Sequence, residues 1–267
     1  FVSVGSGSVG PGFLGTTWAP FVVSSQGNVK NLESSVSQER LVSRLQMLAA
    51  IEDRFIQERR GQLPEDHREV VGKSVQLMSS SQLAAFKVSE EPASVQERYG
   101  ETDFGRGCLM ARRLVEVGVP FVEVNLGGWD NHSNIFGTLA DQRLPNLDRA
   151  MSALIADLAD RGILDTTAVI WMGEFGRTPT INGNGGRDHW ARSWSAVVGG
   201  AGFNRGVVVG ETSTDGREVA SEPYSSQDLM TSVLKALDIS LETTFRAKNG
   251  RPMKIANGGQ IISGLFS

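Results

Sequence analysis

Residues 119–172 constrain the fold most strongly, because they indicate a strand, a helix and a second strand in succession. Residues 119–126 (VPFVEVNL) form an apolar, β-branched run that ends in two glycines, which is typical of a buried strand. Residues 144–158 carry large apolar side chains on one helical stripe, and Gly162 supplies a stop. Residues 167–172 (TAVIWM) form a second buried run. Two buried strands around a helix predict an α/β fold.

The rest of the chain divides by composition into three regions of what we expect to be a single domain, residues 1–267. Residues 1–32 are rich in Gly, Ser and Pro and are predicted to form an ordered loop region. Residues 33–117 are predicted to be mostly helical, and residues 118–267 form the α/β region. The apolar periodicity predicts helices at residues 35–60, 64–86, 95–98, 104–117 and 226–237, and short strands at residues 195–198 and 206–210.

Charge and hydropathy exclude two classes of protein. The chain has 26 Lys and Arg residues against 30 Asp and Glu residues, a net charge of -4, so we expect no nucleic-acid partner. No apolar run approaches the roughly 18 residues that a transmembrane helix needs, so we expect no transmembrane segment. The single cysteine, Cys108, rules out an internal disulfide framework, and its place on an apolar helix face predicts a buried core residue.

Polar residues follow the first predicted strand, where the ligands of open α/β sheets bind. Asp130 and His132 lie two residues apart in this loop. Zinc and similar ions bind imidazole nitrogen and carboxylate oxygen, and a catalytic site keeps three protein ligands and an open position. Taken alone, the pair fits equally well an Asp130 that caps a turn and a His132 that is exposed.

The loop after the second predicted strand contains Glu174 and Arg177. The planar guanidinium group of Arg177 is suited to bind two oxygens of a sulfate or phosphate. The alternative is an ion pair between Glu174 and Arg177, which would hold the loop and contribute little to stability if exposed.

A glycine-rich loop, residues 183–186, leads to Asp188 and His189. The chain has only three histidines, and the third, His67, lies in a polar helical segment and is predicted to be a surface residue. Because His132 and His189 both lie in glycine-rich loops that an α/β fold brings to one rim, we expect a shared site. Its predicted ligands are Asp130, His132, Glu174 and His189.

Three motifs together resemble one family: GWDNH (128–132), GEFGRTP (173–179) and GRDHW (186–190). They are similar to an uncharacterised bacterial family of sulfatase-like proteins, numbered fifteen hundred and one among the domains of unknown function, in the alkaline phosphatase and sulfatase superfamily. The resemblance covers essentially the whole chain. It implies a three-layer α/β/α sandwich of the alkaline phosphatase type, in which Asp130, His132 and His189 bind one divalent metal and Glu174 contributes to a second.

The resemblance implies a metal-dependent hydrolase that acts on sulfate or phosphate esters of a small molecule or a glycan, with Arg177 as the catalytic residue that steadies the oxyanion. Mixed histidine and carboxylate ligands favour zinc or manganese, and calcium stays a candidate. Relatives usually begin with a longer segment and a twin-arginine type export signal, whereas residues 1–15 have no features of a signal peptide. We therefore expect a periplasmic or secreted protein of which residues 1–267 are the C-terminal portion.

Two departures from the superfamily pattern support an alternative. Phe175 stands where the superfamily usually has a His or Asn ligand, and a phenyl ring cannot bind a metal ion. No recognisable nucleophile is present, and Cys108 lies outside the Cys-x-Pro-x-Arg context that a sulfatase nucleophile needs. The alternative is a non-catalytic, degenerate member of the fold used for binding or for cell-envelope organisation. The sequence predicts no oligomeric state.

Overall fold

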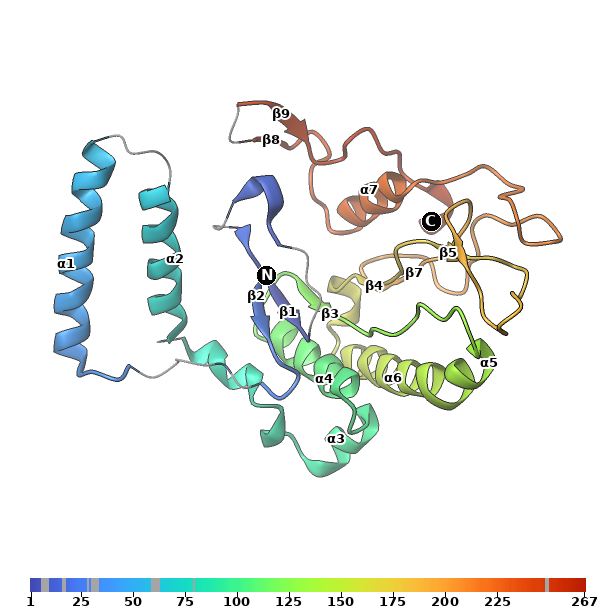
Figure 1. Ribbon diagram of the computed structural model, residues 1–267, viewed down its shortest axis with the longest axis horizontal. Coiled ribbons are helices and arrows are strands. Elements are labelled where there is room, and N and C mark those ends of the chain that lie inside the picture. Colours follow the sequence, from blue (N-terminus) through green and yellow to red (C-terminus); the bar gives the residue numbers. More distant parts are fainter. Residues whose placement is uncertain are drawn as a thin grey trace. The chain divides into compact units, whose positions relative to one another are not determined.

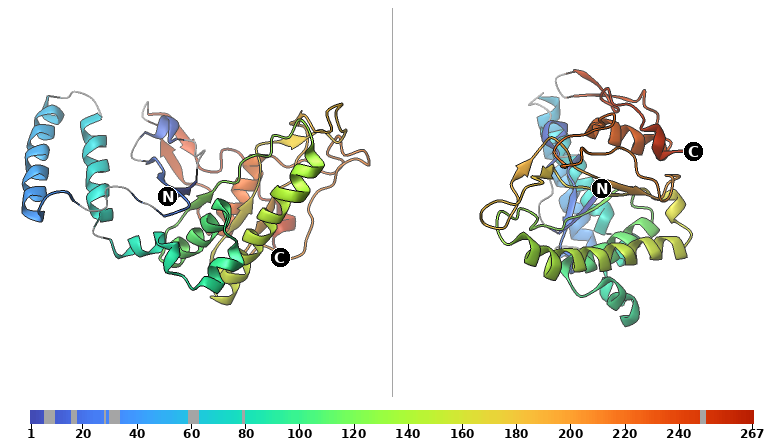
Figure 2. Two further views of the ribbon diagram at one scale, coloured as in Figure 1. Left: turned by 60° about the horizontal axis from the view of Figure 1, so that its bottom comes forward. Right: turned by 90° about the vertical axis from the view of Figure 1, so that its right-hand side faces the viewer.

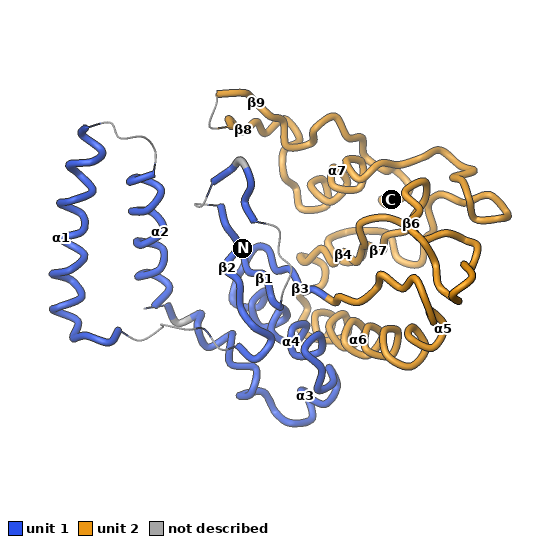
Figure 3. Tube along the Cα trace, in the orientation of Figure 1, with its two compact units in different colours: residues 1–125 blue, residues 126–267 orange. Residues whose placement is uncertain are grey.

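The computed structural model describes residues 1–5, 10–15, 18–27, 29, 34–58, 63–78, 80–247 and 250–267. The chain forms two compact units, residues 1–125 and residues 126–267 (Figures 1 and 3). Both units contain helices and strands, which confirms the predicted α/β class. Within the described ranges, no helix combines the length and the apolar character that crossing a membrane requires.

Among the described residues of the first unit, three strands form a parallel sheet. The central strand β1 (Val2–Val4) pairs with β2 (Phe21–Val23) on one side and with β3 (Val122–Val124) on the other. The prediction that residues 1–32 form a loop region is therefore wrong for β1 and β2. Strands of three residues are too short to show a period, and β1 takes its place in the fold through pairing on both of its edges and through its packing against α4.

The helices of the first unit are α1 (Gln38–Gln57), α2 (Leu63–Met78), α3 (Ala93–Tyr99) and α4 (Asp103–Glu116), with 3-10 turns at Gly12–Leu14, Ser81–Phe86 and Val88–Glu90. Helix α4 packs against β1 and β3 and buries Cys108 and Leu109. A Cβ atom at Gly107 would lie 2.8 Å from Val124 Cγ1, so glycine allows the helix to approach the sheet closely. Burial raises the pKa of the Cys108 thiol to about 12, which confirms its prediction as a core residue.

Helices α1 and α2 run antiparallel, side by side (Figure 2). Helix α1 begins at Gln38 instead of residue 35, because the Ser37 side chain caps it by accepting a hydrogen bond from Arg40 N. The predicted end of this helix at residue 60 lies outside the described residues. The single helix expected at residues 64–86 is divided into α2 and the 3-10 turn at Ser81–Phe86.

The second unit contains α5 (Ile135–Thr138), α6 (Leu144–Asp160) and α7 (Ser226–Ala236), with a π-helical turn at Leu139–Arg143 and 3-10 turns at Leu164–Thr166 and Ser263–Leu265. In the part of this unit that the structure describes, the strands form three antiparallel pairs: β4 (Val169–Trp171) with β7 (Val197–Gly199), β5 (Gly176–Arg177) with β6 (His189–Trp190), and β8 (Thr244–Arg246) with β9 (Pro252–Lys254). Residues 206–210, predicted as a strand, form none.

The predicted strand, helix and strand are present as β3, α6 and β4, and the two strands lie in different sheets. Strand β3 pairs with β1, whereas β4 pairs with β7 in another sheet. Trp171 at the end of β4 is 40% exposed, so this strand is only partly buried. The apolar pattern of a strand does not indicate which other strand it pairs with. The sequence therefore predicted the positions of these strands along the chain but not the sheets to which they belong. The three-layer sandwich stays a prediction.

Candidate metal site

Two loops of the second unit, residues 127–134 and residues 182–188, lie against each other. Three backbone hydrogen bonds join the second loop to the first loop and to Ile135 at the start of α5: Asn134 N to Asn184 O (3.2 Å), Ile135 N to Gly185 O (2.9 Å) and Arg187 N to Asn131 O (3.0 Å). A Cβ atom at Gly186 would lie 2.0 Å from the carbonyl carbon of His132, so only glycine allows this approach. The first loop carries Asp130 and His132, and the second leads directly into His189.

The short β5–β6 pair adds a cation to the site. Arg177 in β5 and His189 in β6 are direct partners in the register of this antiparallel pair. Residues opposite each other in such a pair have neighbouring side chains. The register therefore places the side chain of Arg177 beside that of His189.

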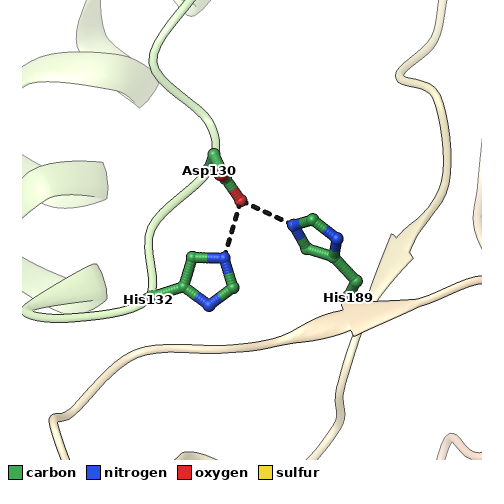
Figure 4. A group of neighbouring side chains, drawn as sticks. All are labelled: Asp130, His132 and His189. Carbon is green, nitrogen blue, oxygen red and sulfur yellow. Dashed lines mark hydrogen bonds and ion pairs between the residues drawn. The ribbon is translucent and has the colours of Figure 1, made fainter.

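Asp130, His132 and His189 converge on one point (Figure 4). The Oδ1 atom of Asp130 lies 3.0 Å from His132 Nε2 and 2.9 Å from His189 Nε2. Two ligand atoms of a tetrahedral zinc ion, with bonds of about 2.0 Å, are about 3.3 Å apart. The three exposed side chains thus lie near the separations that a bound ion needs, and they can hold one.

Asp188 orients one of these histidines. Its Oδ1 atom lies 2.8 Å from His132 Nδ1, the ring nitrogen that faces away from Asp130, and it accepts a hydrogen bond from Asn182 Nδ2 at 3.1 Å. The bond with His132 is the main reason why the pKa of Asp188 lies below its usual value. Metal-binding histidines usually donate their second N–H to such a carboxylate. This role of Asp188 could not be predicted from the sequence, because its partner is the distant His132 and not the adjacent His189.

The guanidinium of Arg177 contacts the carboxylate at the centre of the group. Arg177 Nη1 donates to Asp130 Oδ1 at 2.5 Å. Hydrogen bonds from His189 and then from Arg177 lower the pKa of Asp130 to about 2, so this carboxyl is ionised at neutral pH, as a metal ligand must be. The ion pair considered between Glu174 and Arg177 is replaced by this contact with Asp130.

Glu174 and Phe175 do not extend the group of ligands. Glu174 lies exposed in the bend before β5, outside the group formed by Asp130, His132 and His189. The ring of Phe175 packs against the ring of His189, with 4.6 Å between centroids. Within the described part of the chain, no second group of three ligand residues is found. A second metal bound by Glu174 stays a prediction.

The third histidine, His67, lies in the first unit and contacts Glu52 there. His67 Nδ1 lies 2.6 Å from Glu52 Oε1 between α2 and α1, and the His67 side chain is exposed. It takes no part in the group around Asp130, in keeping with its prediction as a surface residue.

A cavity of about 330 Å³ opens beside the site. Arg177 and Phe175 line one part of it, and both contact members of the metal-ligand group. The hydroxyl-bearing residues Ser193, Ser195 and Thr212 line another part. A ligand in this cavity would therefore meet a positive charge and several hydroxyl groups.

Comparisons with known proteins place the chain in a family. The family model described as "Protein of unknown function (DUF1501)" matches residues 1–266, so the chain belongs to this family. No curated protein and no solved structure matches the chain. These findings correct the expected sulfatase assignment, because the matching family is one of unknown function and not a sulfatase family.

Proposed function

Because the family carries no assigned activity, we propose a function from the site itself: the chain binds one divalent metal ion through Asp130, His132 and His189 and hydrolyses a phosphate or sulfate ester there. The observation that supports this proposal most directly is the single carboxylate oxygen that faces two imidazole nitrogens at 2.9 and 3.0 Å. The carboxylate of Asp188 on the far side of the His132 ring supports it further.

The donor set favours a transition metal. Imidazole nitrogen suits zinc and manganese better than calcium, which prefers all-oxygen sites. Three protein ligands leave an open position, which is characteristic of catalytic zinc sites. We therefore propose zinc or manganese as the bound ion, and the open position as the place where a substrate oxygen or water binds.

The charges of the site favour an anionic ligand. A dication held by one carboxylate and two neutral imidazoles keeps a net positive charge, and Arg177 next to Asp130 adds another. Phosphate and sulfate esters carry oxygens that match both the metal and the fork of Arg177. The hydroxyl-bearing walls of the adjoining cavity suit a polar alcohol, such as that of a small-molecule or glycan ester.

In the proposed reaction, water adds to phosphorus or sulfur and the bond to the ester oxygen breaks. The alcohol leaves with one proton of the water, and the second proton goes to solvent or to the released anion. When held by Asp130, His132 and His189, the metal would lower the pKa of a water molecule and would stabilise negative charge. Arg177 binds the anionic oxygens, and Asp188 keeps His132 in its ligand orientation.

A second candidate function is binding without turnover. The observation that favours it is the phenyl ring of Phe175 against His189, where a second metal ligand was expected. In this case the site holds a metal and an anion, and no ester bond is broken.

The test of the metal site is the zinc content of the purified chain by mass spectrometry, with the affinity measured by competition against a chelator. We expect about one equivalent of metal, and its loss in Asp130→Ala, His132→Ala and His189→Ala variants that circular dichroism shows to be folded. His67→Ala is the matched control, because it removes the remaining histidine and should leave binding unchanged. Absence of metal from the wild-type chain after reconstitution with zinc and with manganese would refute the proposal.

Turnover of 4-nitrophenyl phosphate and 4-nitrophenyl sulfate by the metal-loaded chain separates the two candidates. Hydrolysis that disappears with His189→Ala, and that falls in Arg177→Ala while the metal stays bound, supports the enzyme. Metal-dependent binding of phosphate without hydrolysis supports the binding function.

Two further expectations remain proposals and have separate tests. A three-layer α/β/α arrangement is supported by the α/β composition alone, and an experimental structure would test it. Export to the periplasm or beyond would be tested by fractionating cells that express the full gene.

A further inference from the structure

Helices α1 and α2 form a hairpin, and polar side chains bond the two helices to each other where they touch. The buried carboxylate of Glu52 in α1 contacts His67 Nδ1 at 2.6 Å and Arg68 Nε at 3.2 Å, both in α2. Arg68 Nη2 also donates to Asp53 Oδ1 at 2.8 Å. These bonds fix which sides of the two helices face each other, and therefore which sides face outward.

One outward side of the hairpin is apolar. On α1, Met47, Ile51 and Phe55 recur every four residues and are exposed, with exposed fractions of 66% for Met47 and 55% for Ile51. On α2, Leu63 and Val70 are exposed seven residues apart, and Leu63 is 77% exposed. Spacings of four and seven place each set on one side of its helix.

Both apolar stripes lie on the same side of the hairpin. At 3.6 residues per turn, each stripe is rotated by roughly a third of a turn from the line of contact between the helices, in the same sense. Because the helices run antiparallel, equal rotations bring the two stripes to one face. We call this surface the hairpin face and define it by Met47, Ile51 and Phe55 of α1 and Leu63 and Val70 of α2.

The hairpin face is symmetric about Ile51 along α1. Met47 and Phe55 lie four residues before and after Ile51, and Arg44 and Glu58 lie seven residues before and after it, on the same side of the helix. A second α1 laid antiparallel across this point would place Ile51 against itself, Met47 against Phe55, and Arg44 against Glu58. At each end of the contact, an apolar residue of one copy would therefore face an apolar residue of the other, and a charged residue would face one of opposite charge.

Helix α2 repeats this symmetry about Val70. Leu63 and Leu77 lie seven residues before and after Val70, and Asp66 and Lys73 lie on the same side of the helix, close to equal distances from it. Val70 lies at about the height of Ile51 along the hairpin, because α1 ends at Gln57 and α2 begins at Leu63. One two-fold axis thus serves both helices.

We propose that the hairpin face is a self-association surface, on which a second copy of this chain docks antiparallel to form a four-helix bundle. The interface is isologous, with the same residues contributed by both copies. The opposite charges at its two ends select the antiparallel copy, because a parallel copy would bring Arg44 against Arg44 and Glu58 against Glu58. Glu58, which also pairs with Arg54 in its own helix, would then share its carboxylate with Arg44 of the second copy.

The size of the face suits a reversible dimer. Helix α1 has 20 residues and α2 has 16 residues. At about 1.5 Å per residue and about 10 Å per helix, the face measures about 30 Å by 20 Å, or about 600 Å². Two copies would bury about 1,200 Å², the lower limit for a specific interface. The proposal is independent of the metal site, which lies in the other unit.

Sedimentation equilibrium of the full chain over a range of concentrations tests the proposal. We expect a reversible monomer–dimer equilibrium, with a monomer of 28.8 kDa. Ile51→Asp places two like charges on the axis and should weaken the dimer by at least ~100-fold. Val42→Asp is the matched control, because Val42 is exposed on the same helix but outside the hairpin face. A monomeric wild-type chain at about 100 μM, or a dimer that Ile51→Asp leaves intact, would overturn the proposal.

Charge exchange and cross-linking test the orientation. Arg44→Glu should weaken the dimer, and Arg44→Glu combined with Glu58→Arg should restore it. At a helix separation of 8–10 Å, two Ile51→Cys side chains on the axis are close enough for a disulfide, and buried Cys108 does not compete. We expect a covalent dimer on oxidation of Ile51→Cys and none with Val42→Cys. Equal cross-linking of both variants, or no rescue by the charge exchange, would exclude the antiparallel arrangement.

Discussion

Replacing Gly186 with alanine should separate the two loops of the metal site. The added Cβ would lie 2.0 Å from the carbonyl carbon of His132 and 2.3 Å from both the carbonyl oxygen of His132 and the amide nitrogen of Ser133. All three are backbone atoms, so no side-chain rotation relieves the overlap. An ordinary contact needs about 3.4 Å, so the loops must part by about 1.4 Å.

A movement of this size is large on the scale of metal coordination. Metal–ligand distances tolerate a deviation of about 0.2 Å. A shift of 1.4 Å between the loops would take His189 out of reach of an ion held by Asp130 and His132, and would also break the contact of His132 with Asp188. Loss of a supporting carboxylate alone costs about 10- to 100-fold in metal affinity, so we expect a loss of more than ~100-fold for Gly186→Ala.

Gly183→Ala is the matched control, because a Cβ at this position of the same loop meets no atom within 4 Å. Zinc affinity would be measured for both variants by chelator competition, and the fold checked by circular dichroism. We expect near wild-type affinity for Gly183→Ala. Wild-type affinity in folded Gly186→Ala would refute the reasoning, since the close contact between the loops would then have no part in assembling the site.

Three further predictions concern the first unit. Cys108 should react with a thiol reagent at pH 8 only after denaturation, because burial raises its pKa to about 12, and prompt labelling of the folded chain would contradict this. Leu109→Ala, which truncates a buried side chain of α4, should lower the free energy of unfolding by about 2–5 kcal/mol, and the exposed Val208→Ala should change it little. Equal losses in denaturant titrations would count against the described core. The hydrogen bond with His67 lowers the pKa of Glu52 below its ordinary 4.5, so this carboxylate stabilises the fold above that pH and the contribution is lost as the pH falls through the lowered value. Acid titrations of Glu52→Gln should show a shallower loss of stability between pH 5 and pH 3 than wild type, and parallel curves would contradict the assignment.

Much of the helical structure could be predicted from the sequence. The stripes of α4, α6 and α7 are amphipathic over several turns, and the structure places these helices within a residue or two of the predictions. Local periodicity is sufficient there because each helix satisfies its own backbone hydrogen bonds. Strands β1 and β2 were missed because a strand is stabilised by its neighbours, which for β1 are residues 21–23 and 122–124.

The candidate ligands could also be selected from the sequence. Asp130, His132 and His189 stood out because histidines are scarce in this chain and two of them lie in glycine-rich loops beside carboxylates. Glu174 was predicted as a fourth ligand, but the structure leaves it outside the group. Arg177 was predicted to bind an anion or Glu174, whereas the structure pairs it with Asp130.

The sequence by itself determined the α/β class, the principal helices and a set of four candidate metal ligands, of which three meet in the structure, because residue type and local period carry this information. Tertiary structure alone decided which side chains meet. The contact of Asp188 with His132 spans 56 residues, and that of His189 with Asp130 spans 59. The register of β5 and β6 sets the position of Arg177, and the approach of the loops at Gly186 brings the ligands together. Such contacts depend on how distant segments pack, and no local pattern in the chain encodes that packing.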